Sequence, residues 1–208
     1  MSQWKIRKKA AKQKMRAQQP DKPTPRGLFQ QAESFFQSAV LLFNNATQIP
    51  RYFNPQFIFP SLVCEAFSLE LYLKCVIVIE ESEYPATHDL EKLYALITAE
   101  NRTEIEKICS PHMAQQQSMQ NAYHQHTKQP GAAPTVTFQS MLHASHKAFE
   151  TFRYVHEKNT LSDGEGWQGG PIVRSVRERL MILRPEWRNF RFVEPTKPPE
   201  PPAASPTP

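Results

Sequence analysis

Apolar residues are densest over residues 57–82, which the rest of the chain flanks with weaker patterns. Within this stretch, the run from 62 to 79 is interrupted only by Glu65, Ser68, Glu70 and Lys74. A surface helix would alternate one apolar stripe with a polar face, whereas this segment has almost no polar face. The pattern predicts a helix that is buried on most sides. Pro60 and the internal charges argue against a membrane-spanning segment, so no membrane association is expected.

Helical spacing of apolar residues recurs on both sides of this segment. Further helices are predicted over residues 28–46, 88–99, 101–108 and 138–158, and from Pro171 to about Pro185. Residues 110–134 are rich in Gln and poor in aliphatic residues, which predicts an irregular or mobile insertion. No run of alternating apolar and polar residues indicates a strand. The expected fold is an all-α, up-and-down helical bundle.

The two ends of the chain differ from its middle in composition. Residues 1–26 hold nine Lys or Arg residues against one Asp, whereas the formal net charge of the whole chain is only +5. The excess of positive charge therefore belongs to an amino-terminal arm. Residues 193–208 are rich in Pro and cannot bury enough apolar area to fold. Both ends are predicted to be disordered, with one helical domain over residues 27–192 between them.

Two groups of basic residues are candidates for nucleic-acid contact, because clustered Lys and Arg attract phosphate groups. The arm offers Lys5, Arg7, Lys8, Lys9, Lys12 and Lys14. On the final helix, Arg174, Arg177 and Arg184 lie within about a quarter-turn of one another. Glycine-rich residues 163–170 precede that helix, and such a helix start can hold a phosphate. A solubilising tail and an ordinary solvated helix face are the simpler interpretations.

The three cysteines, Cys64, Cys75 and Cys109, form no Cys-x-x-Cys motif, and two of them lie in the central apolar segment. They are expected to be small core residues of a reduced, cytoplasmic protein. The basic arm has no apolar segment after its charges and is not expected to be a secretory signal.

Glu70 and Lys74 stand four residues apart with the acid first, an order that favours a direct side-chain pair on one helix face. Isolated buried charge is costly, so these two groups must be paired or must face a cavity. The pattern indicates either a structural ion pair or the wall of a polar pocket inside the bundle.

His143 and His146 are three residues apart, a spacing that can place two imidazoles on one metal ion. A third ligand would be needed from Glu150, or from His124 and His126 in the predicted insertion. None of the tight metal-binding signatures is present. No metal or other cofactor is therefore expected.

Three short motifs in a fixed order resemble the HEPN domain family, a small all-helical family named for nucleotide binding. They are Ala-x-x-x-Glu-x-x-x-Lys in one helix, His-Asp-Leu after a loop, and Arg-Tyr in a later helix. These motifs fall at Ala66, Glu70, Lys74, His88, Asp89, Leu90, Arg153 and Tyr154. The resemblance covers residues 28–185. It implies a polar cluster between helices, composed of Glu70, Lys74, His88, Asp89 and Tyr154.

Many HEPN proteins are metal-independent ribonucleases that carry an Arg followed by a His, with four to six residues between them. No Arg of this chain has a His at that distance, and the nearest pair, Arg153 and His156, has two residues between. Members that lack the motif are linked to RNA or nucleotide binding, to nucleotidyltransferase partners, and to toxin–antitoxin or defence systems. The resemblance therefore implies a non-catalytic RNA- or nucleotide-associated module.

Two alternatives remain open. In a divergent ribonuclease, His156 would serve as general acid–base and Arg153 would stabilise the charged transition state. A homodimer is expected, and it could bring a second copy of both residues to one cleft. The other alternative is an antitoxin-like module that acts only by binding a protein partner.

Overall fold

The computed structural model describes residues 23–47, 55–126, 131–146 and 168–189, and every regular element within these ranges is a helix. The elements are α2 (Pro25–Thr47), α3 (Pro55–Glu81), α4 (Leu90–Leu96), α5 (Ala99–His126), α6 (Phe138–Ser145), α9 (Gly170–Leu183) and the 3₁₀-helix η1 (Pro185–Asn189). The prediction of an all-α helical bundle is confirmed for this part of the chain. Residues 1–22 of the basic arm, the Pro-rich tail and most of the predicted 138–158 helix lie outside the described residues, while Pro25 and Arg26 at the end of the arm already belong to α2.

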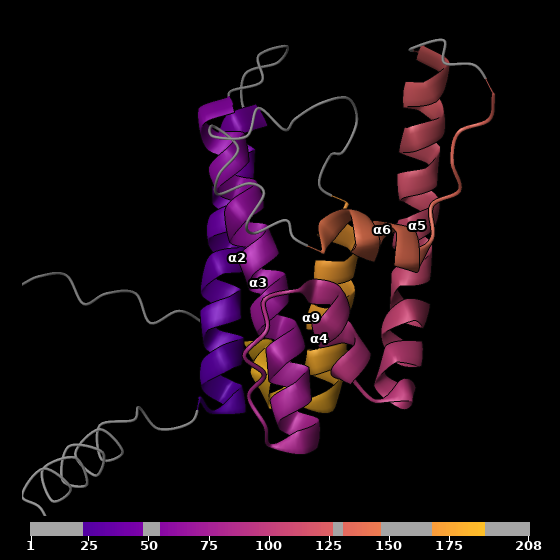
Figure 1. Ribbon diagram of the computed structural model, residues 1–208. Coiled ribbons are helices and arrows are strands. Elements are labelled where there is room, and N and C mark those ends of the chain that lie inside the picture. Colours follow the sequence, from indigo (N-terminus) through magenta and orange to yellow (C-terminus); the bar gives the residue numbers. More distant parts are fainter. Residues whose placement is uncertain (1–22, 48–54, 127–130, 147–167, 190–208) are drawn as a thin grey trace, which may run out of the picture.

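Helix α3 lies at the centre of the bundle, as the apolar pattern predicts. It packs against α2, α4 and α9, and α9 in turn packs against α5 (Figure 1). The pair of α2 and α3 is antiparallel, because Cys75 near the end of α3 contacts the carbonyl oxygen of Pro25, while Ser61 near its start donates to the carbonyl of Ala39. Among the described helices, none combines the length and hydropathy needed to cross a membrane.

Burial along α3 explains why its polar face is missing. Every residue from Ser68 to Val78 is buried, including the charged Glu70 and Lys74. The first turns are less covered, and Phe57 is exposed. The helix ends at Glu81, because the backbone of the next residue, Ser82, takes a positive φ of 56° and so cannot continue a right-handed helix.

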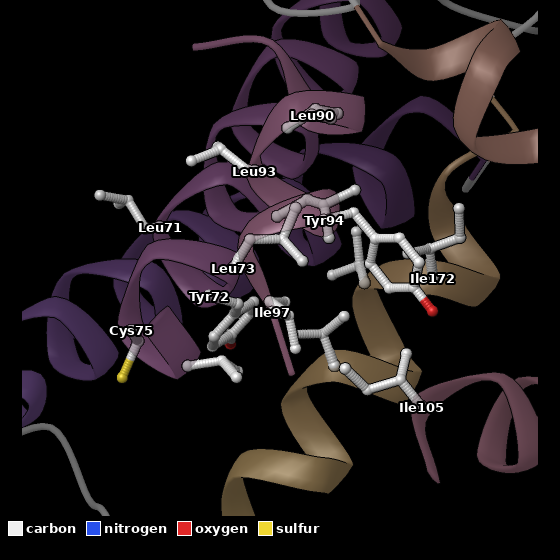
Figure 2. Packing of buried hydrophobic residues seen from close by; sticks show 14 of the residues in the cluster. Leu71, Tyr72, Leu73, Cys75, Leu90, Leu93, Tyr94, Ile97, Ile105 and Ile172 are labelled. Atoms are coloured by element: carbon white, nitrogen blue, oxygen red, sulfur yellow. The ribbon is translucent and has the colours of Figure 1, made fainter. Parts of the chain in front are cut away.

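The hydrophobic core gathers side chains from α3, α4, α5 and α9. Leu73, Tyr94, Ile105 and Ile172 converge there (Figure 2). Helix α2 adds Phe29, whose ring lies 5.9 Å from that of Tyr72 and 4.8 Å from that of Trp187. Burial of a large apolar side chain stabilises a fold by roughly 1.5–3 kcal/mol, so this cluster is what holds the helices together. Cys75 and Cys109 are buried free thiols of this core, and Cys64 is half-buried.

Local capping explains most of the helix starts. The Thr24 hydroxyl accepts the Gly27 N–H at the start of α2. Asp89 accepts the N–H groups of Glu91 and Lys92 at the start of α4. Each such contact satisfies a backbone donor that the helix itself leaves unpaired. Since Asp89 is the cap and Ile97 is extended, α4 is shorter than the predicted helix over 88–99.

The prediction of an irregular segment over residues 110–134 is wrong for residues 110–126, which continue α5 through Pro111. The predicted short helix over 101–108 is thus the first part of a helix of 28 residues. Gln, Met and Ala have good helix propensity, and the segment lacks an apolar stripe because this half of α5 is largely exposed. Residues 131–137 then return along α5, where Gln117 donates to the Pro134 carbonyl and accepts the Val136 N–H.

Candidate functional site

The first candidate is the Glu70 cluster, composed of Glu70, Lys74, His88 and Tyr84. The Lys74 Nζ lies 2.9 Å from Glu70 Oε1, and neither side chain is more than 2% exposed. His88 Nδ1 approaches the same oxygen at 2.8 Å, while its side chain is 61% exposed. The Lys74 ammonium also lies 4.8 Å from the centre of the Tyr84 ring. The cluster therefore joins a buried ion pair to the surface through His88.

The carboxylate of Glu70 is bound on one side only. Both Lys74 and His88 contact Oε1. The other oxygen, Oε2, is buried without a hydrogen-bond partner among the described residues. A buried acceptor without a partner costs free energy, so such atoms are rare in native structures.

The remaining members of the predicted cluster do not join it within the described part of the chain. Asp89 caps α4 instead, and its Oδ2 lies 3.4 Å from Lys92 Nζ. Burial opposes ionisation of this carboxyl, but the N–H of Lys92 and its ammonium outweigh that effect and lower the pKa of Asp89. Tyr154 lies outside the described residues, as do Arg153 and His156.

A second polar group, the Glu33 network, joins Glu33 of α2 to Tyr72 of α3 and Arg177 of α9, and it was not predicted from the sequence. Arg177 donates from Nε and Nη2 to the two oxygens of Glu33, at 2.5 and 3.0 Å. The Tyr72 hydroxyl donates to Glu33 Oε1 at 2.5 Å. Burial, reinforced by the Glu33 charge, raises the pKa of Tyr72 well above its ordinary value.

This network changes the interpretation of the predicted basic patch, composed of Arg174 and Arg177 within α9 and Arg184, the residue that caps its end. Arg177 is held by Glu33 with its side chain 28% exposed, so it stabilises the fold and is not part of an open anion-binding surface. Arg174 and Arg184 are exposed. They stand ten residues apart, about 15 Å along a helix, at opposite ends of α9. The predicted patch is thus divided, and Arg174 lies beside a concave surface.

That surface is the Arg174 groove, with a volume of about 440 Å³ between α2, α3, α5 and α9. It is lined by Phe36, Ala39, Val40, Phe43, Asn44, Ser61, Glu65, His112, Gln115, Gln116, Met119, Gln168, Gly170, Pro171 and Arg174. Phe43 and Met119 are 49% and 61% exposed. A Cβ on Gly170 would lie 3.4 Å from Glu65 Oε1, so the first turn of α9 approaches this carboxylate closely. The groove thus combines aromatic rings, amides, a cation and an acid.

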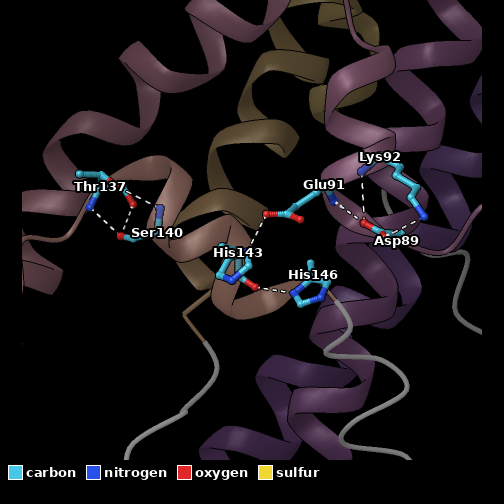
Figure 3. A network of polar contacts seen from close by, with 7 residues as sticks. All are labelled: Asp89, Glu91, Lys92, Thr137, Ser140, His143 and His146. Carbon is cyan, nitrogen blue, oxygen red and sulfur yellow. Dashed lines mark hydrogen bonds and ion pairs between the residues drawn. The ribbon is translucent and has the colours of Figure 1, made fainter.

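A third group, the imidazole cluster of Glu91, His143 and His146, lies where α4 meets α6 (Figure 3). His143 Nδ1 lies 3.0 Å from Glu91 Oε1. The two imidazole rings are stacked with their centres 5.2 Å apart. Glu91 was not a candidate from the sequence, because it precedes His143 by 52 residues.

The six basic residues of the arm lie outside the described residues, so their predicted contact with nucleic acid stays a prediction. Comparison of the chain with protein-family models, with curated proteins and with solved structures finds no match.

Proposed function

We propose that this protein is a non-catalytic, HEPN-like module that binds RNA or a nucleotide in the Arg174 groove. The observation that carries the proposal is the composition of the groove, which offers one group for each part of a nucleotide. Its volume of about 440 Å³ lies within the range of small-molecule sites.

The base and the phosphate have separate partners in the groove. Unstacked bases are commonly held on aromatic rings, which Phe36 and Phe43 supply here. The side-chain amides of Gln115 and Gln116 both donate and accept hydrogen bonds, as base edges require. The exposed Arg174 suits a phosphate because its planar guanidinium forms paired, charge-assisted bonds.

The Glu65 carboxylate makes the groove unsuitable for a bare anion. Its Oε1 stands at the start of α9, where a phosphate would otherwise sit. A carboxylate accepts hydrogen bonds from hydroxyl groups, so this side of the groove suits a ribose. The ligand class is therefore a nucleoside with phosphate, either free or within a single strand of RNA.

Two features elsewhere in the chain support the proposal. The arm residues Lys5–Lys14 would add attraction to the backbone of RNA independent of its sequence. The motif residues of the HEPN resemblance, Glu70, Lys74 and His88, meet in one cluster, and Glu70 Oε2 has no hydrogen-bond partner among the described residues.

Exposed apolar side chains on α2 and α5 favour protein interaction as a second candidate function. Leu41 is 63% exposed, and Phe43 and Met119 border the same groove. Such a surface suits a partner such as a toxin or a nucleotidyltransferase, with or without RNA.

The test is binding of a fluorescein-labelled single-stranded RNA of mixed sequence, followed by anisotropy in EDTA, with unlabelled ATP as competitor. Arg174→Glu is expected to weaken binding at least about tenfold. The matched control, Arg184→Glu, makes the same charge change at the other end of α9 and should have a much smaller effect. Replacing the six arm residues by Gln should make the salt dependence shallower.

Equal losses in both Arg variants, or no binding of RNA and ATP, would contradict the groove and favour the protein-interaction module. The same assay tests the ribonuclease alternative. Cleavage in EDTA that disappears in both Arg153→Ala and His156→Ala, with folding intact by circular dichroism, would show that the protein is catalytic.

A further inference from the structure

We propose that the imidazole cluster, Glu91, His143 and His146, is a binding site for a divalent transition metal of the zinc class. One potential ligand atom from each of the three residues lies within 4.8 Å of the other two. Two histidines and one glutamate are a ligand set that zinc uses in proteins. This site goes beyond the proposed nucleotide groove and does not depend on it.

The spacing of His143 and Glu91 already resembles that of two ligands on one ion. His143 Nδ1 and Glu91 Oε1 are 3.0 Å apart. Ligands about 2.1 Å from a tetrahedral zinc stand about 3.4 Å from one another. A metal ion could therefore replace the proton between these atoms with little movement. Both side chains have room to adjust, because they are 74% and 41% exposed.

The orientation of His146 supplies the second observation. Its Nδ1 lies 2.6 Å from the backbone carbonyl oxygen of His143. In a neutral imidazole this nitrogen is then the N–H donor, and Nε2 keeps a lone pair for a metal. Metal-ligating histidines usually have such a partner behind them, which fixes the ring and its tautomer.

The backbone around the cluster is held from both sides (Figure 3). Thr137 and Ser140 form a reciprocal cap at the start of α6, while Asp89 caps α4. The N–H of Leu90 donates to the His146 carbonyl at 3.2 Å, which ties the end of α6 to the start of α4. The backbones of the three ligand residues are thus held by packed helix ends, whereas the stacked rings of His143 and His146 must turn for their lone pairs to converge on one ion. A fourth position would be left to water or to another ligand.

The experiment is a titration of the full-length, untagged protein with Co²⁺, followed by displacement with Zn²⁺ in a calorimeter. One equivalent of Co²⁺ should produce the visible absorption of a tetrahedral site without the intense near-ultraviolet band of thiolate ligation. His143→Ala, His146→Ala and Glu91→Gln should each weaken metal binding at least about tenfold. The matched control is the double variant His124→Ala and His126→Ala, which removes two imidazoles from α5. It should bind Co²⁺ and Zn²⁺ as tightly as the wild type does.

The outcomes separate the proposal from adventitious binding. Absence of both Co²⁺ absorption and Zn²⁺ heat in the folded protein would overturn it. So would site variants that bind metal like the wild type, or a control variant that loses as much affinity as they do. Circular dichroism of each variant distinguishes lost ligation from lost folding, and Glu91→Gln keeps the shape of the side chain while removing its charge.

Discussion

Glu33 and Glu70 are both buried, and the cations that balance their charge come from different parts of the fold. Glu33 lies on α2 and receives Tyr72 from α3 and Arg177 from α9, so both of its oxygens are bound and three helices are joined. The cation that contacts Glu70 is Lys74, four residues further along the same helix. One of its oxygens is bound twice and the other has no partner among the described residues.

The difference separates a structural role from a candidate functional one. A carboxylate whose hydrogen bonds are all made and whose partners span the bundle stabilises and specifies the packing of its helices. A carboxylate with one oxygen unbound among the described residues, close to an exposed imidazole, keeps the capacity to accept a further hydrogen bond. We therefore expect substitutions in the Glu33 network and in the Glu70 cluster to change the stability of the fold by different amounts.

The largest effect is expected for Arg177→Met, which leaves Glu33 buried without its cation. Loss of one partner of a buried pair should lower the free energy of unfolding by about 3 kcal/mol. Urea unfolding followed by circular dichroism measures it. Arg174→Met is the matched control on the exposed side of the same helix and should change stability by less than about 0.5 kcal/mol. Equal effects of the two variants would show that the Glu33 network is not structural.

A smaller loss, roughly 1–3 kcal/mol, is expected for Lys74→Met, because Lys74 contacts one oxygen of Glu70 whereas Arg177 binds both oxygens of Glu33. The double variant Glu70→Leu with Lys74→Met removes both charges and should be more stable than the single variant. Differential scanning calorimetry is the measurement. An unchanged melting midpoint in Lys74→Met would contradict a buried pair.

Alkaline pH offers a third comparison, because the Glu33 network contains a tyrosine and the Glu70 cluster has only the exposed Tyr84. Burial raises the pKa of Tyr72, and it raises the pKa of Cys75 to about 12. In the unfolded chain these two groups ionise near pH 9 to 10. In the folded protein they stay protonated to higher pH. Their contribution to stability is complete below that range and is lost as the pH rises.

Unfolding in urea at about pH 7.5 and 10.5 tests this expectation. Tyr72→Phe should be destabilised at both values, but its further loss at the higher pH should be smaller than that of the wild type by roughly 0.5–1 kcal/mol. Tyr84→Phe serves as the control on the other cluster. A pH dependence that Tyr72→Phe leaves unchanged would mean that this hydroxyl is not shielded from ionising.

The smallest effect is expected for His88→Gln, at less than about 0.5 kcal/mol, because this side chain is 61% exposed and the contact is screened by water. Gln keeps a donor for Glu70 Oε1 but cannot carry a charge. A thermal shift as large as that of Lys74→Met would make His88 a structural member of the cluster and weaken the functional interpretation.

The same two glutamates show what a sequence can predict. The pairing of Glu70 with Lys74 followed from their distance of one helical turn and from the apolar residues around them. Glu33 and Arg177 are separated by 144 residues, and no local pattern links them. Glu91 and His143 were missed for the same reason, since only the packing of α4 on α6 brings them together.

The spans of the helices could be predicted where one face is buried, because burial leaves apolar periodicity in the sequence. They could not be predicted where the helix is exposed. Helices α2, α3 and α9 each bury apolar residues, and their predicted spans agree closely with the structure. The second half of α5 is largely exposed, so its residues carry no apolar periodicity although their propensity is helical. Pro111 lies inside this helix, although Pro lacks the N–H that a helix interior uses.

The separation of Glu33 from Arg177 has a consequence for the order of folding. Helices α2 and α3 are neighbours in sequence and pack side by side, whereas α9 leaves the ribosome more than 80 residues after α3 ends. Until α9 docks, Glu33 lacks the Arg177 cation, and the apolar surface of α3 that α9 will cover is not yet packed against it. Arg177→Met should therefore raise the unfolding rate more than it slows folding in stopped-flow measurements. A nascent chain that ends before residue 170 would carry an unpaired acid beside an open apolar surface, the kind of intermediate that chaperones bind.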